Sequence, residues 1–537
     1  MGHRNLKQDV QAKLTSEWLK HSYTTARLRD NVLLQPARYK LFGHKQSEKE
    51  FSTKDDDSDT TNDEPLKDFF DAEWSLLSSD LYKFVDESVF VIQPHVESSS
   101  QKLTTPKLQL EESIALVESL PSWKVVGKFL GLTKHPHSQY IFPKKSFETL
   151  LRKAAVMPSF SSIFLSVEKM SPLQKETYSK AFKVEKIFDR YTLVLQIFRL
   201  RVRTKEAKLQ VALAEMPYVR AMLAAKSSGN YQRHSIVGES FQDRINQEFR
   251  FKEQKLKKLL KSLKQKRDAH RASRKRANVP VVAVVGYTNA GKTSLIKALT
   301  ASETMEPKDQ LFATLDVTAH AAVLPNNLRY VLVDTVGFLS DLPHELFDAF
   351  SATMEDMLQA DLIIHVRDSN HPDHSNQLRN VLLILSNLRL EERLLSNIIE
   401  VRNKIDLLPV RTDEDGEVVN LPEVSWPKSQ PLRLKGEQVD MRPAVICRVS
   451  ATSGAGIRTL INQIQKSIMR VTNRQRVVLC VPAGGSHLQW IRNHGAVESV
   501  TGDGDYHLSL TTIVTQAQLH KFLANFDDVK ITQDAVF

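Results

Sequence analysis

A chain of 537 residues exceeds what one hydrophobic core ordinarily supports, so its length predicts three or four domains. Hydrophobic residues make up 41% of the chain and charged residues 26%, which is typical of a globular protein and argues against a fibrous or wholly disordered one. No apolar run reaches the roughly 18 to 20 residues that span a bilayer, so we expect no membrane insertion. The two cysteines, Cys447 and Cys480, lie in apolar strand-like runs, which predicts buried free thiols rather than a disulfide framework.

The positive charge is concentrated in one segment. The net charge is +11, and residues 250–276 alone carry 13 Lys or Arg against Glu253 and Asp268, which is also a net of +11. The rest of the chain therefore sums to about zero. Such a segment favours a polyanion as partner, although the solvated outer face of a long helix is an alternative.

The N-terminal part divides at an acidic stretch. Residues 1–104 are expected to form an extension, with "KDDDSDTTNDEP" (54–65) as a disordered linker and irregular structure from 66 onward. Residues 105–200 are expected to form a small α/β domain. Its predicted strands are "SSIFLSVEKM" (161–170) and "RYTLVLQIF" (190–198), and "SFETLLRKAA" (146–155) is its predicted helix.

Residues 201–278 carry two helical patterns separated by "SSGN". The first spans about 203–226, with Leu209, Leu213 and Met216 on one stripe, continued by Met222 or Leu223. The second spans about 240–276 and repeats apolar residues at three- and four-residue steps. These residues are Ile245, Phe249, Leu256, Leu259 and Leu263. An antiparallel basic hairpin is the simplest packing.

Residues 279–470 alternate apolar runs with helical segments. The runs "VVAVV", "RYVLVD", "DLIIHVRD", "IIEVRNKID" and "AVICRVSA" are typical of a mostly parallel sheet buried on both faces. A doubly wound α/β domain follows, with a polar insertion at 409–443. Residues 471–537 predict a small α+β C-terminal domain. In that domain Trp490 is interpreted as a core residue rather than a base-stacking platform.

"GYTNAGKT" (286–293) fits the phosphate-binding pattern G-x-x-x-x-G-K-[ST] between a strand and a helix. Glycines let backbone N–H groups approach phosphate oxygens, and the helix N-terminus adds positive potential. Lys292 is expected to reach the β- and γ-phosphates, and the Thr293 hydroxyl to ligate Mg²⁺. The residues expected around the phosphates are Gly286, Tyr287, Thr288, Asn289, Ala290, Gly291, Lys292, Thr293 and Ser294.

The phosphate loop alone does not distinguish ATP from GTP, whereas "NKID" (403–406) favours guanine. Asp406 is able to accept hydrogen bonds from guanine N1–H and the exocyclic amine, and adenine would leave it unpaired. Asn403 and Lys404 are expected to support the base and the phosphate loop. "SAT" follows a further strand, where the Ala451 N–H is expected to contact guanine O6. Its residues are Ser450, Ala451 and Thr452.

"DTVG" (334–337) has the form of a γ-phosphate sensor. Asp334 is expected to hold Mg²⁺ through water, and the Gly337 amide to contact the γ-phosphate; Thr335 and Val336 complete the segment. Thr314 is the predicted second Mg²⁺ ligand, with Thr318 as the alternative. Phe338 stands where many GTPases have the glutamine that orients the attacking water. We interpret this hydrophobic substitution as keeping intrinsic hydrolysis slow.

Together, "DQLFATLDVT", "DTVGFLSDLPHELFDAFSATMED", "ADLIIHVRDSNHPD" and "NKID" resemble the HflX-type GTPases, and "FDRYTLVLQIFRLRVRTKEAKLQVALAEMPY" resembles their N-terminal domain. The resemblance covers about 105–470 and is strongest to the eukaryotic, mitochondrial branch. It implies an N-terminal α/β domain, a helical hairpin and a P-loop G domain. Two segments depart from the family. Its glycine-rich segment near the hairpin tip is reduced here to "SIVGESFQDR", which keeps Gly238 and Glu239. A glycine-containing turn of its N-terminal domain appears here as "FPKKSF", with Pro143 and Lys144.

The resemblance also implies the function. The expected activity is Mg²⁺-dependent hydrolysis of GTP to GDP, with Lys292, Gly337 and Thr314 as catalytic residues. The expected partner is the large ribosomal subunit and its rRNA, bound through 250–276 by a monomer that splits ribosomes or assists large-subunit assembly. The alternative is a nucleotide-gated RNA-binding assembly protein with negligible turnover. A mitochondrial location is implied, with the cytoplasm as alternative.

Overall fold

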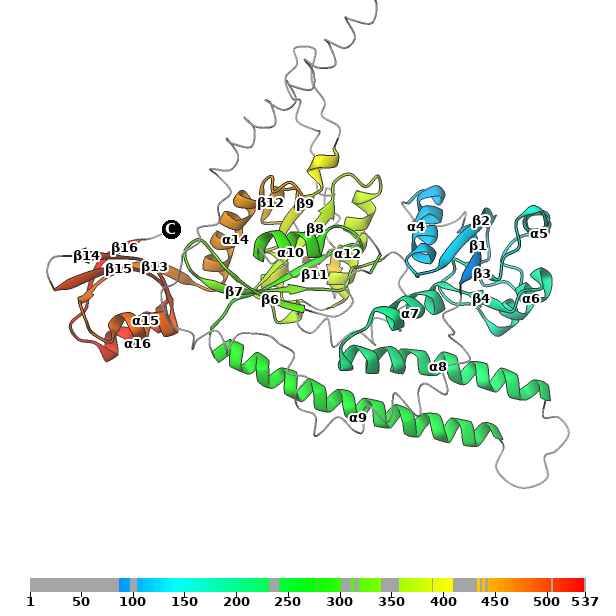
Figure 1. Cartoon of the computed structure of the whole chain (residues 1–537), viewed down its shortest axis with the longest axis horizontal. Coiled ribbons are helices and arrows are strands. Elements are labelled where there is room, and N and C mark those ends of the chain that lie inside the picture. Colours follow the sequence, from blue (N-terminus) through cyan, green and yellow to red (C-terminus); the bar gives the residue numbers. More distant parts are fainter. Residues whose placement is uncertain are drawn as a thin grey trace, which may run out of the picture. The chain divides into compact units, whose positions relative to one another are not determined.

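The structure is a computed structural model that describes the chain in segments (Figure 1). The described residues are 86–96, 104–230, 241–276, 278–300, 311–312, 318–339, 357–388, 390–408, 432–434, 437–439, 443–503 and 506–535. The acidic linker at 54–65, Gly238, Glu239 and Thr314 therefore lie outside the described residues. None of the described helices is long and apolar enough to cross a membrane.

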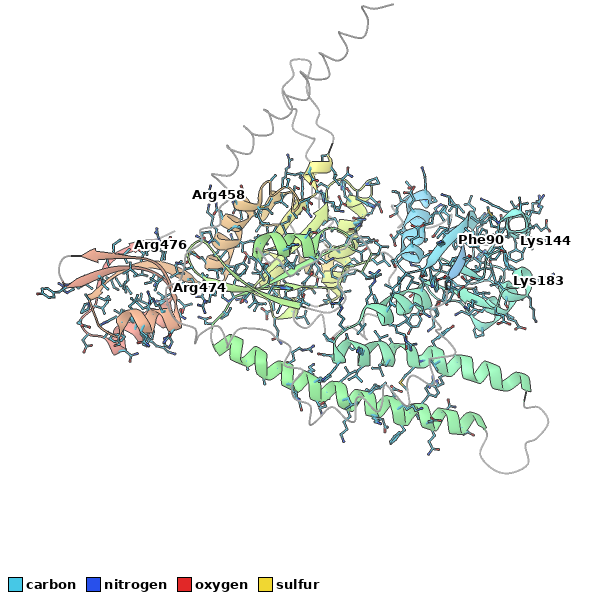
Figure 2. All side chains as sticks on the ribbon, in the orientation of Figure 1. Phe90, Lys144, Lys183, Arg458, Arg474 and Arg476 are labelled. Atoms are coloured by element: carbon cyan, nitrogen blue, oxygen red, sulfur yellow. The ribbon has the colours of Figure 1, made fainter. Side chains whose placement is uncertain are left out.

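Four parallel strands form the first sheet, in the order β2-β1-β3-β4. They are β1 (Glu87–Val96), β2 (Trp123–Thr133), β3 (Ser162–Leu165) and β4 (Lys186–Phe188), and helices α4 (Pro106–Glu118), α5 (Lys144–Val156), α6 (Pro172–Phe182) and α7 (Arg190–Arg201) connect or follow them. Successive residues of β1 enter two different cores, because side chains alternate along a strand. Val91 packs with α4 and α7, and Phe90 packs with α5 and α6. Figure 2 labels Phe90, whose ring lies 5.3 Å from that of Phe160.

Two sequence-based expectations for this part are wrong. The sheet already contains β1, inside the 66–104 stretch expected to be irregular; Pro94 is unusual in a central strand and conceals it. The run at 190–198 is helix α7 and not a strand. All nine of its residues are buried, so they show no amphipathic period. The deciding signal is the capping box, in which Asp189 and Thr192 bond each other's backbone N–H groups at 2.8 and 3.0 Å.

Two long helices, α8 (Lys205–Asn230) and α9 (Phe241–Arg276), pack along one another. Leu209 and Met216 of α8 share a buried cluster with Phe249 and Leu256 of α9. Arg267, near the end of α9, bonds Glu206 at the start of α8 at 2.7 Å, so the helices run antiparallel. The expected apolar stripes therefore meet, although the side chains of Ile245, Met222 and Leu223 lie outside the description.

Six strands form the largest sheet, in the order β12-β9-β8-β5-β7-β6. They are β5 (Val281–Gly286), β6 (Thr318–Val323), β7 (Arg329–Asp334), β8 (Leu362–Asp368), β9 (Ile399–Asn403) and β12 (Val445–Arg448). Only β6 runs antiparallel to its neighbour. The expected doubly wound α/β architecture of a P-loop domain is thus confirmed. Part of the 409–443 insertion is described, as the hairpin of β10 (Leu432–Leu434) and β11 (Glu437–Val439).

Helices cover both faces of this sheet. On one face lie α12 (His374–Asn387) and α13 (Glu392–Leu395), packed on Ala283 and Ile363. On the other face lie α10 (Lys292–Thr300) and α14 (Ile457–Val471), packed on Val284 and Ile364. Strand β5 lies between β7 and β8, because the chain runs from β5 through α10 to β6 and β7 on one side and then crosses to β8 on the other. In such sheets ligands bind at this switch point, at the carboxyl ends of the strands.

The C-terminal strands and helices alternate as βαββαβ. They are β13 (Arg474–Pro482), α15 (His487–His494), β14 (Ala496–Asp503), β15 (His507–Thr515), α16 (Gln516–Asn525) and β16 (Lys530–Ala535). The antiparallel sheet has the order β14-β15-β13-β16, with both helices packed through one apolar cluster. This is the ferredoxin-like arrangement. Trp490 packs against that cluster, and Arg476, labelled in Figure 2, pairs with Glu498 at 2.6 Å.

Candidate nucleotide-binding site

The phosphate loop leaves β5 and ends where α10 begins. A Cβ on Gly286 would lie 2.3 Å from the Val366 carbonyl oxygen, so only glycine fits beside β8. Gly291 has φ +90, a conformation that side chains with a Cβ rarely adopt. A Cβ there would lie 2.3 Å from Nδ2 of Asn403, the first residue of the predicted guanine motif. The two motifs are therefore in direct contact.

Within this loop, Tyr287, Thr288 and Ala290 are buried and Asn289 is exposed. Lys292 is the first residue of α10, and its Nζ donates to the carbonyls of Gly286 at 3.3 Å and Tyr287 at 3.0 Å. Burial lowers the pKa of its ammonium group to about 8, and the negative charge of Asp334 opposes part of that shift. The Lys292 cation is thus held against the phosphate loop at the N-terminal end of α10, and a cation beside a helix N-terminus suits a polyphosphate.

Thr293 and Asp334 meet beside the loop. The Thr293 hydroxyl donates to Oδ2 of Asp334 at 2.7 Å, and Asp334 is 1% exposed at the end of β7. A hydroxyl and a carboxylate are hard oxygen ligands, so this pair fits Mg²⁺, which in nucleotide sites takes one or two protein ligands together with phosphate oxygens and water. The neighbouring Thr335 has a different role, because its hydroxyl donates to the Val284 carbonyl of β5 at 2.8 Å.

The guanine motif lies at the ends of β9 and β12. Nδ2 of Asn403 donates to the Ala290 carbonyl at 3.0 Å, and its Oδ1 accepts from the Ala451 N–H at 3.1 Å. Lys404 adopts a left-handed conformation with φ +62, and its ammonium pairs with Asp368 at 2.8 Å.

The remaining predicted base-contact residues differ in exposure. Asp406 and Thr452 are exposed, whereas Ser450 is fully buried and accepts from the Ser453 N–H at 3.0 Å. Asp406 is thus free to meet a base. In contrast, the Ala451 N–H predicted to contact guanine is bonded to Asn403 in this structure.

Comparisons with known proteins agree with this geometry. A family model described as a 50S ribosome-binding GTPase matches residues 281–404, and one described as a GTP-binding GTPase middle region matches 201–274. "GTPase HflX" of Caldanaerobacter subterraneus subsp. tengcongensis is 40% identical over 232 residues, which are 42% of this chain and 53% of that protein. "Putative GTP-binding protein 6" of Xenopus laevis is 40% identical over 420 residues, which are 77% of this chain and 74% of that protein. The chain belongs to the HflX-type GTPase family.

Among solved structures, a GTP-binding protein from the archaeon Sulfolobus solfataricus in complex with GDP is similar to this HflX-type chain. It covers 72% of this chain and 99% of its own, with 22% sequence identity and a TM-score of 0.36.

Phe338 occupies a different place in this HflX-type site than the sequence suggested. Its side chain is 1% exposed and belongs to the core cluster that includes Val285 and Ile363, so it lies among apolar groups rather than at a water position. Its backbone pairs with the phosphate loop, donating to the Gly286 carbonyl at 3.1 Å and accepting from the Thr288 N–H at 2.8 Å. The residue therefore anchors the "DTVG" segment (334–337) to the phosphate loop.

Gly337 is required for the same contact. A Cβ at this position would lie 2.9 Å from Cα of Thr288 and 3.0 Å from Nζ of Lys292. Any side chain would push the segment away from the loop, because backbone atoms cannot give way as a flexible side chain does.

Two histidines near the site were not predicted. His320, on β6, bonds the Thr318 hydroxyl at 2.8 Å, and burial lowers its pKa while Asp334 opposes the shift. His365, on β8, stands between Val285 and Glu400 in register and is 2% exposed. The signal for His365 is a polar residue inside the apolar run "LIIHVRD". It adjoins a buried ion-pair cluster in which Glu400 bonds Arg367 at 3.3 Å and Arg402 at 3.1 Å.

We expect His365 to make the protein acid-sensitive. Burial, followed by the charges of Arg367 and Lys292, lowers its pKa from 6.5 to about 3. Between these pH values the unfolded chain binds one more proton than the folded chain, so the free energy of unfolding falls on acidification by up to about 1.4 kcal/mol per pH unit. Above pH 6.5 the residue contributes no pH dependence.

The measurement is urea unfolding between pH 7.5 and 5. His365→Gln should flatten the loss of stability below pH 6.5, whereas the same change at the exposed His520 should leave the slope as in the wild type. If the free energy of unfolding fell equally steeply with pH in the wild type and both variants, His365 would not be the source of the acid sensitivity.

Proposed function

We propose that this HflX-type chain is a Mg²⁺-dependent GTPase that acts on the large ribosomal subunit, in ribosome splitting or recycling or in large-subunit assembly. The observation that carries the proposal is that three groups meet at the carboxyl ends of the strands of the large sheet. Lys292 follows β5, the Thr293–Asp334 pair lies beside the end of β7, and Asn403 ends β9 while contacting the phosphate loop. The family match to ribosome-binding GTPases supports the choice of partner.

In the proposed site the nucleotide lies along these strand ends. Lys292 and the Gly291 backbone would stabilise charge that develops on the transferring phosphoryl group. Thr293 and Asp334, with Thr314 from outside the described residues, would hold Mg²⁺, which supplies further neutralisation of the phosphate charge. The Gly337 N–H would contact the γ-phosphate, and Asp406 would accept from the guanine edge.

Water activation requires a group that Phe338 cannot supply, because its side chain lies in the core. We propose that the ribosome completes the catalytic arrangement, so that intrinsic hydrolysis is slow. The alternative, a nucleotide-gated RNA-binding assembly protein with negligible turnover, shares every feature of the site. Turnover must therefore separate the two functions.

The test is steady-state GTP hydrolysis with and without purified large subunits. We expect slow turnover alone and stimulation of at least about tenfold by large subunits, consistent with the scale of activation in trans among GTPases. Lys292→Ala serves as the background control. No turnover under either condition would contradict the enzyme and support the gated assembly protein.

Mitochondrial and cytosolic large subunits should be compared side by side in this assay. We propose the mitochondrial matrix as the location, on the strength of the resemblance to the eukaryotic branch of the family. Stronger stimulation by mitochondrial subunits is the expected result. Stronger stimulation by cytosolic subunits would instead favour the cytoplasm.

We further propose that α9 provides the rRNA-binding surface. Its outer face is exposed and basic, and the ion pair between Lys257 and Glu253, with side chains 60% and 42% exposed, contributes little stability. Crowded cations repel one another along a helix, and phosphates relieve that repulsion while releasing counterions. Structured RNA, recognised through its backbone and shape, suits such a surface.

Charge reversal of four exposed lysines should therefore abolish association with large subunits while leaving GTP affinity within about twofold. These residues are Lys257, Lys258, Lys261 and Lys264. The measurement is co-sedimentation, and the control is the same reversal at exposed lysines outside the hairpin. These controls are Lys124, Lys128, Lys145 and Lys521. Unchanged co-sedimentation of the helix variant, or equal loss in both variants, would count against a specific surface on α9.

A further inference from the structure

Helix α9 exposes one large aromatic side chain on its basic face. Phe251 is 68% exposed, whereas Phe249, two residues earlier, is 5% exposed and packs against α8. Residues two apart on a helix point about 200° away from each other, so the packing that buries Phe249 directs Phe251 outward. Among the α9 side chains that the structure describes, Phe251 is the only large apolar one that is exposed.

Cations surround this ring along the helix. Lys255 and Lys258 follow one and two turns later on the same stripe, about 6 and 10 Å along the axis, and Arg250 precedes it. Within the described part of the chain, no carboxylate forms an ion pair with Arg250 or Lys258. The one acid on this stripe, Glu248, already pairs with Lys252 at 2.7 Å.

A single ring among cations is poorly suited to an apolar partner. Protein interfaces bury a contiguous apolar centre and contain few lysines, and membrane-surface helices carry an apolar face of several residues. An unpaired nucleotide offers a flat base to cover the ring and phosphates to neutralise Arg250 and Lys258.

We propose that Phe251 stacks on an unpaired base of the bound RNA while Arg250, Lys255 and Lys258 hold the flanking phosphates. This inference rests on the proposed function, because it specifies how α9 contacts RNA. It assigns to the helix a preference for RNA with an unpaired base over continuous duplex, which positive charge alone would not give.

The test uses two RNA stems of equal length and charge, one fully paired and one with a single bulged purine. The full-length wild type should bind the bulged stem more tightly. Phe251→Ala should weaken that binding by about tenfold to hundredfold, the range of base–aromatic stacking, and leave the paired stem unchanged. Phe251→Trp should restore the preference, whereas Phe251→Leu, which keeps apolar surface without an aromatic face, should not.

Salt dependence separates stacking from charge. Phe251→Ala should retain the wild-type slope of log affinity against log salt concentration, and Lys258→Gln should reduce it by about 0.7 to 0.9. Tyr506→Ala, which removes a 79% exposed aromatic outside the hairpin, is the matched control and should change neither stem. Because both rings are exposed, neither substitution should lower the melting temperature.

The outcomes distinguish this inference from the proposed function. Wild-type co-sedimentation with large subunits that is unaffected by Phe251→Ala, together with equal binding of both stems, would overturn the stacking contact alone. Full co-sedimentation of Phe251→Leu with large subunits, without any preference of the wild type for the bulged stem, would overturn it in favour of an apolar protein contact. A wild type that binds neither RNA nor large subunits would overturn both proposals.

Discussion

Asp406→Asn should weaken GTP binding by at least about hundredfold and create affinity for xanthosine triphosphate. The carboxylate would accept two charge-assisted hydrogen bonds from guanine, each worth about 1.5 to 3 kcal/mol. Asparagine instead presents an NH₂ group toward the guanine donors. Xanthine carries a carbonyl where guanine carries its exocyclic amine, so the new NH₂ group gains a partner.

The measurement is equilibrium binding of fluorescent GTP and xanthosine triphosphate analogues to wild type and variant. Asp406 is exposed at the start of a short helix (Ile405–Leu407), outside the core, so its replacement should leave the fold intact. Recovery of affinity with the xanthine nucleotide is an internal control for folding. An unchanged preference for GTP would remove Asp406 from the base site.

Phe338→Gln should destabilise the G domain by about 3 to 5 kcal/mol and should not raise the basal rate of hydrolysis. The side chain is 1% exposed in an apolar cluster, so the substitution removes aromatic packing and buries an amide with no partner there. A glutamine at this position would point into the core and would not reach an attacking water unless the segment rearranged.

Phe338→Leu is the matched control, because it stays apolar and should cost less than about 2 kcal/mol. Hydrogen exchange of β5 and β7 amides, followed against urea concentration, reports the stability of this domain without averaging over the others. A stable Phe338→Gln variant with faster basal turnover would contradict the buried position. It would restore the sequence-based interpretation of Phe338 as a substituted catalytic residue.

Motifs that depend on the backbone were predictable from sequence. "GYTNAGKT" contains glycines at both positions of this loop where the structure leaves no room for a Cβ. The neighbours that exclude a Cβ come from distant segments, but the motif is recognised from residue types at fixed spacing within eight residues. The strands of the large sheet were predictable because burial on both faces produces continuous apolar runs. The same pattern failed at 190–198, where burial on all sides hides the helical period and only the capping residues distinguish helix α7 from a strand.

The sequence by itself determined the phosphate loop, the guanine motif, the basic helix and the family, because each depends on residue types at short, fixed spacings. Only the tertiary structure decided where Phe338, Phe251 and His365 point. Phe338 turns into the core although it adjoins the "DTVG" segment, and Phe251 turns outward although it is apolar. The physical reason is that the direction of a side chain follows from the elements packed against its own, and neighbouring letters in the sequence do not carry that information.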